Sequence, residues 1–284
     1  MEHGRGVLLL IGGAEDKVGA KQILRRFVEL AGGPAARIVV IAAASSFEDL
    51  VGRRYLNLFG NLGAGRVEVL QVRDRNEARH PLALAQIEQA SGIFMTGGDQ
   101  LKLTALFGGT PLAEGIRRRY RAGAVIGGTS AGASAAAEHM LAYGGSGLTP
   151  RKALMQYAPG LGLVQGVVVD QHFGARNRAG RLMTAVAHNP DLIGIGLDED
   201  TAVEIDTNQH ITVHGQGAVM VVDAGDLHYT DLYRVPDHAP VALFGLRTHI
   251  LTAGCHYDLT SRTPAPPSAS PSFQEQGLIE GEGI

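Results

Sequence analysis

The chain has a single cysteine, Cys255, among its 284 residues, so it can form no intrachain disulfide. Nothing else in its composition indicates an oxidising compartment. No apolar run is long enough to span a membrane, and the apolar stretch at residues 7–11 is too short for the core of a signal peptide and ends in Gly12-Gly13. From these absences we expect a cytoplasmic protein that does not associate with membranes.

An excess of basic charge is also absent. The chain has 25 Lys and Arg residues against 28 Asp and Glu residues, which gives a formal net charge of -3. Proteins that bind nucleic acid or anionic lipid without sequence or headgroup specificity need a broad cationic surface, and this charge balance does not supply one. We therefore expect no nucleic-acid partner.

Motifs that would indicate two other kinds of chemistry are missing as well. No predicted helix contains His-x-x-x-His and there are no paired cysteines, which argues against a zinc hydrolase. There is no strict Gly-x-Gly-x-x-Gly and no glycine-rich loop ending in Gly-Lys-Ser/Thr, so a non-catalytic nucleotide-binding protein with a Rossmann-like sheet is a distant alternative. We expect no metal and no organic cofactor.

Short segments rich in Val and Ile alternate with amphipathic segments through the first half of the chain. The predicted strands are residues 7–11, 37–42, 67–72, 92–95 and 124–127, and the predicted helices are residues 21–30, 50–59, 82–90 and 112–121. This alternation predicts an α/β fold with a mostly parallel sheet flanked by helices. Ligands bind such sheets at the carboxyl ends of the strands, where three Gly-Gly turns fall, at residues 12–13, 97–98 and 127–128.

The second half of the chain has a different pattern. Predicted strands at residues 193–197, 202–205, 211–213 and 218–222 are spaced as in a β-meander. Beyond about Ser261 the sequence is rich in Pro and Ser, which is typical of a disordered segment. We predict one domain over residues 1–260 and a disordered tail over residues 261–284.

Ser130 is the candidate nucleophile. It lies in Gly128-Thr129-Ser130-Ala131-Gly132, where an apolar strand ends and a helix begins. The flanking glycines have no Cβ to clash at a sharp turn, and the backbone N–H of Ala131 would point at an oxyanion beside the serine. Phosphate-binding loops also place serine among glycines, so the motif by itself leaves catalysis and phosphate binding open.

A serine nucleophile needs a base, and His172 is the candidate among eleven histidines. It follows a predicted strand in a segment whose charge density could not be buried without partners. The polar residues of this segment are Asp170, Gln171, His172, Arg176, Arg178 and Arg181. Two other histidines, His139 and His188, lie within helical patterns and are interpreted as capping or packing residues.

The acidic run Asp198-Glu199-Asp200 follows the predicted strand at residues 193–197. A carboxylate at this position could fix the tautomer of the histidine and stabilise its cation. An acidic triplet is more often a solvated turn, and the spacing does not separate Asp198 from Glu199.

From about Val7 to Leu251 the chain resembles the cyanophycinases, relatives of the aspartyl dipeptidases. The resemblance rests on five motifs in order, which are Ile11-Gly-Gly-Ala-Glu-Asp16-Lys17, Thr96-Gly-Gly-Asp99-Gln100-Leu101, Gly127-Gly-Thr-Ser130-Ala-Gly-Ala, Asp170-Gln-His172-Phe with the three arginines that follow, and Gly196-Leu-Asp-Glu199-Asp-Thr201. It implies the triad Ser130, His172 and Glu199. It also implies a class I glutamine-amidotransferase-like (flavodoxin-like) fold with added C-terminal β-strands, and a homodimer.

The resemblance further implies the substrate and the reaction. The substrate would be cyanophycin, a polyaspartate whose side chains carry arginine, cut by an exopeptidase into β-Asp-Arg dipeptides through an acyl-enzyme on Ser130. The oxyanion would lie between the N–H of Ala131 and an N–H of the Gly98-Asp99 turn. The alternative within the same clan is an aspartyl or isoaspartyl dipeptidase acting on β-aspartyl peptides.

A ligand that carries both guanidinium and carboxylate groups needs side chains of both charges in its groove. The candidate binding residues are Gln100, Asp170, Gln171, Arg176, Arg178 and Arg181. Among the arginines, Arg178 and Arg181 could instead begin a helix and pair with surface acids. Arg176 precedes that helix and is the strongest binding candidate.

Overall fold

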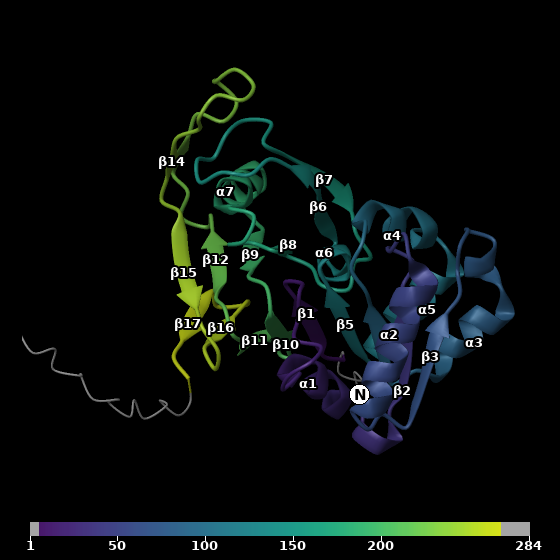
Figure 1. Cartoon of the computed structure of the whole chain (residues 1–284). Coiled ribbons are helices and arrows are strands. Elements are labelled where there is room, and N and C mark those ends of the chain that lie inside the picture. Colours follow the sequence, from purple (N-terminus) through teal and green to yellow (C-terminus); the bar gives the residue numbers. More distant parts are fainter. Residues whose placement is uncertain (1–5, 268–284) are drawn as a thin grey trace, which may run out of the picture.

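The computed structural model describes residues 6–267, and its largest element is a nine-stranded sheet (Figure 1). Five neighbouring strands in the order β1-β5-β4-β2-β3 are parallel, and four antiparallel strands in the order β10-β11-β16-β17 extend the sheet beyond β1. The strands are β1 (Leu8–Ile11), β2 (Arg37–Ile41), β3 (Arg66–Leu70), β4 (Gly92–Met95), β5 (Val125–Thr129), β10 (Thr201–Ile205), β11 (His210–Gly215), β16 (His256–Asp258) and β17 (Thr263–Ala265). The predicted fold class, mostly parallel α/β with added C-terminal strands, is confirmed.

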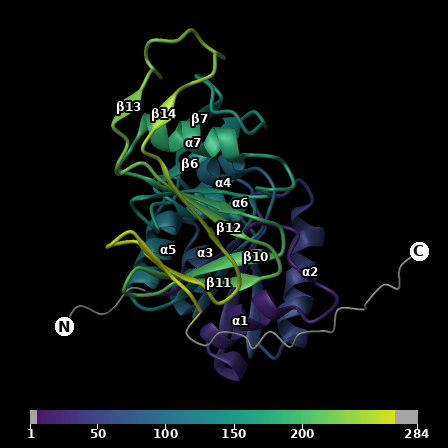
Figure 2. The same cartoon turned by 90° about the vertical axis from the view of Figure 1, so that its left-hand side faces the viewer.

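Helices cover both faces of the parallel strands (Figures 1 and 2). Within the described residues they are α1 (Gln22–Leu30), α2 (Glu48–Asn61), α3 (Pro81–Gln89), α4 (Gln100–Phe107), α5 (Pro111–Arg121), α6 (Ala131–Ala136) and α7 (Ala179–His188), with short 3-10 helices at Gly33–Ala35 and Glu77–Arg79. None of these helices is long and apolar enough to cross a membrane. The four helices predicted for the first half correspond to α1, α2, α3 and α5.

The alternation of side chains along each buried strand divides the core into two layers. In β1, Leu9 and Ile11 pack in the layer that contains Phe27 of α1 and Phe59 of α2. The intervening residues of β1 pack on the opposite face, in the larger layer that includes side chains of α3, α4, α5 and α6. Because apolar side chains cover both faces, the parallel strands read as continuous apolar runs in the sequence.

A second, four-stranded sheet has the order β15-β12-β9-β8 and packs against α7. Its strands are β8 (Val167–Asp170), β9 (Ile193–Leu197), β12 (Val219–Asp223) and β15 (Arg247–Leu251). The predicted meander is therefore wrong: β10 and β11 form a hairpin in the large sheet, whereas β9 and β12 pair with each other in the second. Local spacing could not reveal this because the chain changes sheets within the three-residue turn between β9 and β10.

Two hairpins lie beside the second sheet, as Figure 2 shows, at the end of the molecule away from α1. One pairs β6 (His139–Gly144) with β7 (Met155–Pro159), and the other pairs β13 (Tyr229–Thr230) with β14 (Leu243–Phe244). His139 thus begins a strand, and its predicted helical position is wrong, although its ring does pack edge-on against Tyr157. His188 ends α7, as predicted, and contacts the ring of Tyr233.

The predicted tail begins at residue 261, but the structure continues in an ordered strand beyond that residue. The hydroxyl of Ser261 donates to Asp258 at 2.9 Å, and Thr263–Ala265 forms the edge strand β17. Pro264 is tolerated there because an edge strand needs no hydrogen bond on its outer side. The rest of the predicted tail, residues 268–284, lies outside the described residues.

Candidate active site

Ser130 lies in the sharp connection between β5 and α6, at the carboxyl edge of the large sheet. Its backbone has φ 53° and ψ −110°, a conformation that non-glycine residues rarely adopt, and its N–H donates to the carbonyl of Ile11 at 2.9 Å. A Cβ on Gly128 would lie 2.5 Å from the carbonyl oxygen of Gly132, so glycine is required for the chain to turn this tightly. The turn leaves the Ser130 hydroxyl at the sheet edge.

His172 approaches Ser130 from the loop after β8. Its Nε2 lies 3.0 Å from the Oγ of Ser130, and its backbone N–H donates to the carbonyl of Gly12 at 2.8 Å. A Cβ on Gly13, which has φ +100°, would lie 2.4 Å from the Cε1 of the imidazole. The Gly12-Gly13 turn therefore both anchors the His172 backbone and leaves room for its ring.

Glu199 lies in the turn between β9 and β10, and its Oε1 is 2.6 Å from the Nδ1 of His172. The neighbouring acids have other partners: Asp198 Oδ1 accepts the N–H of Gly174, and Asp200 Oδ1 accepts the N–H of Asp16, both at 2.8 Å. Both neighbours thus fix loops of the site, and Glu199 is the acid that reaches the imidazole. The tertiary structure provides the distinction that sequence spacing could not.

Two backbone N–H groups were predicted to face an oxyanion at Ser130, one from Ala131 and one from the Gly98-Asp99 turn. Ala131 is the first residue of α6, and N–H groups in the first turn of a helix have no partner within the helix. The prediction is wrong for Asp99, because its N–H donates to the carbonyl of Ala44 at 2.9 Å and its side chain caps α4. This leaves Gly98 as the candidate from that turn.

Gly97 and Gly98 allow the turn after β4 to approach both Ser130 and the loop after β2. A Cβ on Gly97 would lie 3.4 Å from the Cβ of Ser130. Gly98 has φ +144°, and a Cβ there would lie 2.1 Å from the carbonyl oxygen of Ala44. A side chain at Gly98 would therefore displace the turn from the loop after β2, whereas a Cβ at Gly97 would make ordinary contact with Ser130.

Asp170 and two of the three arginines form an internal cluster. Asp170 is 1% exposed, accepts from the Nε of Arg181 at 2.5 Å and also from its Nη2, and accepts from the Nη1 of Arg178 at 3.2 Å. Arg178 also donates to the carbonyl of Gln171. Burial lowers the pKa of Arg178 to about 10 despite the opposing effect of Asp170. Each charge thus has a partner inside the protein, where the cluster holds the His172 segment against α7, and of the three residues Arg178 also lines a cavity.

The other predicted binding residues have different surroundings. Gln171 is buried, with its Oε1 3.4 Å from the Oγ of Ser130. The side-chain amide of Gln100 donates to the carbonyls of Leu141 and Ala142 at 3.0 and 3.2 Å, so its nitrogen connects α4 to β6. Arg176 is exposed in the loop between His172 and α7. Of this set, Gln171 and Arg176 are the side chains placed to meet a ligand.

A buried polar cluster that the sequence analysis did not assign lies behind the nucleophile. It consists of Glu15, Lys17, Tyr55 and Thr129. Burial raises the pKa of Glu15, but Lys17 and the hydrogen bonds from Thr129 and Tyr55 outweigh burial, so the pKa of this carboxyl is below its usual value. Burial and the charge of Glu15 raise the pKa of the Tyr55 phenol. The available signal was an acid directly after the Gly12-Gly13-Ala14 turn.

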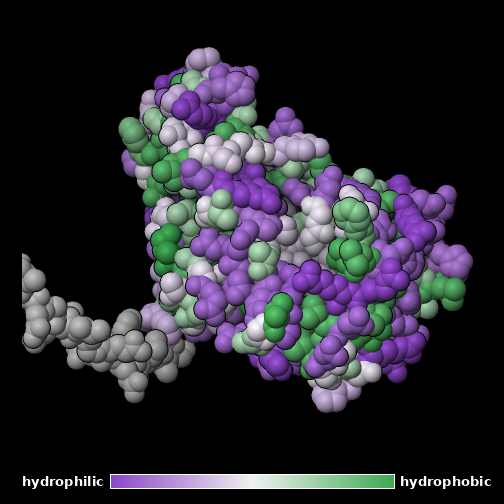
Figure 3. Space-filling view, viewed as in Figure 1, coloured by the Kyte–Doolittle hydropathy of each residue, from purple (hydrophilic) through white to green (hydrophobic). Residues whose placement is uncertain are grey.

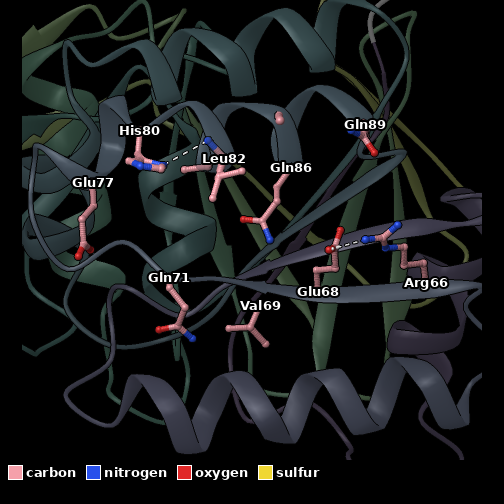
Figure 4. A pocket seen from close by; sticks show the side chains of 11 residues that line it. Arg66, Glu68, Val69, Gln71, Glu77, His80, Leu82, Gln86 and Gln89 are labelled. Carbon is pink, nitrogen blue, oxygen red and sulfur yellow. Dashed lines mark hydrogen bonds and ion pairs between the residues drawn. The ribbon is translucent and has the colours of Figure 1, made fainter.

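The cavities of the molecule differ in their relation to these residues. The cavity in Figure 4, of ≈ 540 Å³, lies between β3 and α3, and none of Ser130, His172 and Glu199 lines it. A second cavity, of ≈ 330 Å³, is lined by Phe173 and Asp198, the sequence neighbours of the base and the acid, and by Leu148, Gly174, Arg178, Met220 and Ile250 among others. On the face in Figure 3, apolar patches are separated by hydrophilic residues. Neither of these two cavities is lined by Ser130, His172 or Glu199.

Comparisons with known proteins identify the family and the fold. Residues 8–213 match the model of peptidase family S51. The chain is 45% identical over 260 residues to a cyanophycinase of Trichormus variabilis, covering 91% of this chain and 87% of that protein. It is 45% identical over 264 residues to a cyanophycinase of Geminocystis herdmanii, covering 93% and 97%. The crystal structure of a peptidase from an acI-B1 actinobacterium has the same fold, with a TM-score of 0.64 at 24% identity, covering 91% of this chain and 98% of that chain.

Proposed function

This chain belongs to peptidase family S51 and is a serine peptidase, and we propose that its substrate is cyanophycin, multi-L-arginyl-poly-L-aspartate. As an exopeptidase it would release β-Asp-Arg dipeptides. The observation that carries the proposal is the alignment of Ser130 Oγ, His172 and Glu199 Oε1, with contacts of 3.0 and 2.6 Å, in a chain 45% identical to cyanophycinases.

The geometry supports acyl transfer. The Oγ of Ser130 attacks the scissile carbonyl while the Nε2 of His172 takes its proton, and Glu199 at Nδ1 stabilises the resulting imidazolium and keeps the ring oriented. The imidazolium then donates its proton to the leaving amine. Water hydrolyses the acyl-enzyme with His172 again acting as the base, which restores the free serine.

The negative charge that develops on the carbonyl oxygen needs donors that are already in place. The N–H of Ala131 at the start of α6 and that of Gly98 in the adjacent turn are the proposed pair, and the positive end of the helix favours the same charge. These donors require no rearrangement during the reaction. Removing one such donor in a serine peptidase costs about 10² to 10³ in kcat.

Substrate recognition is assigned to the exposed side of the His172 loop. Arg176 can bind a carboxylate of the polymer in a bidentate manner, and Gln171 can hydrogen-bond near the scissile bond. The Asp170 cluster supports this loop from inside. Its two arginines keep the loop in place and are not assigned to the substrate.

The proposal is tested by incubating purified protein with cyanophycin and identifying the products by mass spectrometry. We expect β-Asp-Arg dipeptides from the wild type and none from Ser130→Ala. Parallel reactions with isoaspartyl dipeptides test the alternative activity. Hydrolysis of those dipeptides without hydrolysis of the polymer would overturn the assignment of cyanophycin.

Two further properties are proposed from the sequence and its resemblance to the cyanophycinases. We propose that the chain forms a homodimer and acts in the cytoplasm, in keeping with its single cysteine. Sedimentation equilibrium tests the first property, with a mass near 60 kDa expected, about twice the 29.9 kDa of the chain. Subcellular fractionation tests the second.

A further inference from the structure

Glu15 lies 3% exposed directly behind the nucleophile, although its carboxylate is outside the proposed triad. We propose that Glu15 is a positioning residue that fixes Ser130 relative to His172 by holding the hydroxyl of Thr129. This inference rests on the proposed function, since it assigns a role in the same serine chemistry. It adds a fourth functional side chain whose action passes through its neighbours.

The contacts of Glu15 occupy both of its carboxylate oxygens. Its Oε2 accepts the hydroxyl of Thr129 at 2.6 Å, and its Oε1 lies 2.9 Å from the Nζ of Lys17 and accepts the hydroxyl of Tyr55. Thr129 is itself 3% exposed and directly precedes Ser130. Three donors converging on one buried carboxylate hold it in a single position.

The location of Glu15 connects the two halves of the triad. It lies two residues beyond the Gly12-Gly13 turn, which accepts the backbone N–H of His172 and leaves room for its ring. Its carboxylate accepts the hydroxyl of Thr129, the residue before the nucleophile. Glu15 therefore links the turn beneath the base to the turn that carries the serine.

The backbone of Ser130 needs such support. Its φ of 53° and ψ of −110° are unfavourable for a residue with a Cβ, and such conformations persist only when the surrounding structure constrains them. The N–H of Ser130 is fixed by Ile11. The side-chain hydroxyl of Thr129, the residue directly before Ser130, is fixed by Glu15.

A purely structural role would not require a charge at this position. Burying a carboxylate is unfavourable, and replacing a buried ion pair by apolar residues of similar volume is often neutral or stabilising. Here the Lys17 side chain, 16% exposed, offsets the charge of Glu15. The interactions gained in return are directional contacts beside the nucleophile, which supports a positioning role.

The test uses matched variants. Thr129→Val removes the hydroxyl and keeps the shape, Thr129→Ser keeps the hydroxyl, and Glu15→Gln keeps the shape but places an NH2 group among three donors. Each is measured for kcat and KM on cyanophycin and for the rate of Ser130 phosphorylation by diisopropyl fluorophosphate. Circular dichroism confirms that each variant is folded at the assay temperature.

We expect Thr129→Val and Glu15→Gln each to lower kcat about 10- to 100-fold with KM within about twofold, because small displacements of reacting groups have effects of this size. The labelling rate should fall in parallel. Thr129→Ser should stay within about threefold of wild type, and the double variant Glu15→Gln/Thr129→Val should lose no more than about what Thr129→Val loses, since both disrupt one interaction.

A folded Thr129→Val protein with wild-type kcat and labelling, or additive losses in the double variant, would overturn the proposal. The two Thr129 variants decide the question if Glu15→Gln does not fold. The labelling rate distinguishes a wrong role for Glu15 from a wrong assignment of the nucleophile. A wild-type protein that is not labelled at Ser130 contradicts the nucleophile, whereas equal labelling of wild type and Thr129→Val contradicts only the role of Glu15.

Discussion

Asp170→Asn distinguishes two roles for the charged segment around His172. If Asp170 bound the guanidinium of a substrate, its loss would raise KM and leave the free energy of unfolding unchanged. In the structure Asp170 is 1% exposed and accepts from Arg178 and Arg181, which are 8% and 6% exposed. We therefore expect the substitution to reduce stability.

The size of the effect follows from the burial. Removing one partner of a buried ion pair leaves an uncompensated charge and costs about 3 to 5 kcal/mol of the free energy of unfolding. Here two guanidinium groups would be left facing each other. The entropy of unfolding is about 2.1 cal/mol/K per residue, or about 0.6 kcal/mol/K for 284 residues, so the expected fall in Tm is about 5 to 8 °C.

Thermal unfolding followed by circular dichroism measures this fall, and kcat and KM are measured well below the Tm. Asp49→Asn is the control, because Asp49 is 57% exposed and its pair with the 64% exposed Arg73 spans 3.4 Å in solvent. An exposed pair contributes about 0 to 1 kcal/mol, so the Tm of the control should move by less than about 2 °C. A Tm within about 1 °C of wild type for Asp170→Asn, together with a raised KM, would refute the internal role and restore the substrate role.

Three further outcomes are expected. Ser130→Ala should lower kcat by at least about a thousandfold, with the circular dichroism spectrum unchanged; a smaller loss would remove Ser130 as the nucleophile. Glu199→Gln should lower kcat far more than Asp200→Asn, because an amide favours the wrong imidazole tautomer; equal kcat values for the two would contradict the assignment of the acid. Arg176→Ala should raise KM for the polymer about tenfold and leave the rate of Ser130 labelling by diisopropyl fluorophosphate unchanged. Arg176→Lys should recover only part of the binding, because an ammonium group cannot bind a carboxylate in a bidentate manner. A loss of labelling in Arg176→Ala would instead indicate that Arg176 holds the His172 loop.

The sequence by itself determined the elements and the residue types of the site. Buried parallel strands require short apolar runs and surface helices require amphipathic segments, so the strands β1 to β5 and four helices could be predicted from the length, composition and periodicity of these segments. The sharp turn at Ser130 could also be predicted from its glycines, because a Cβ at Gly128 would clash with the chain at Gly132 and only glycine allows that approach.

Only the tertiary structure decided which of these residues meet. The turn from Asp198 to Asp200 passes between two sheets, so its three acids face different partners, and Glu199 alone of the three reaches His172. The partners of Asp170 could likewise not be predicted from the sequence, since the sequence around a charged residue does not show whether its side chain faces solvent or a buried arginine. Local patterns report the period of a strand or helix, whereas side-chain partners depend on how segments distant in the chain pack together, and that packing assembled this site.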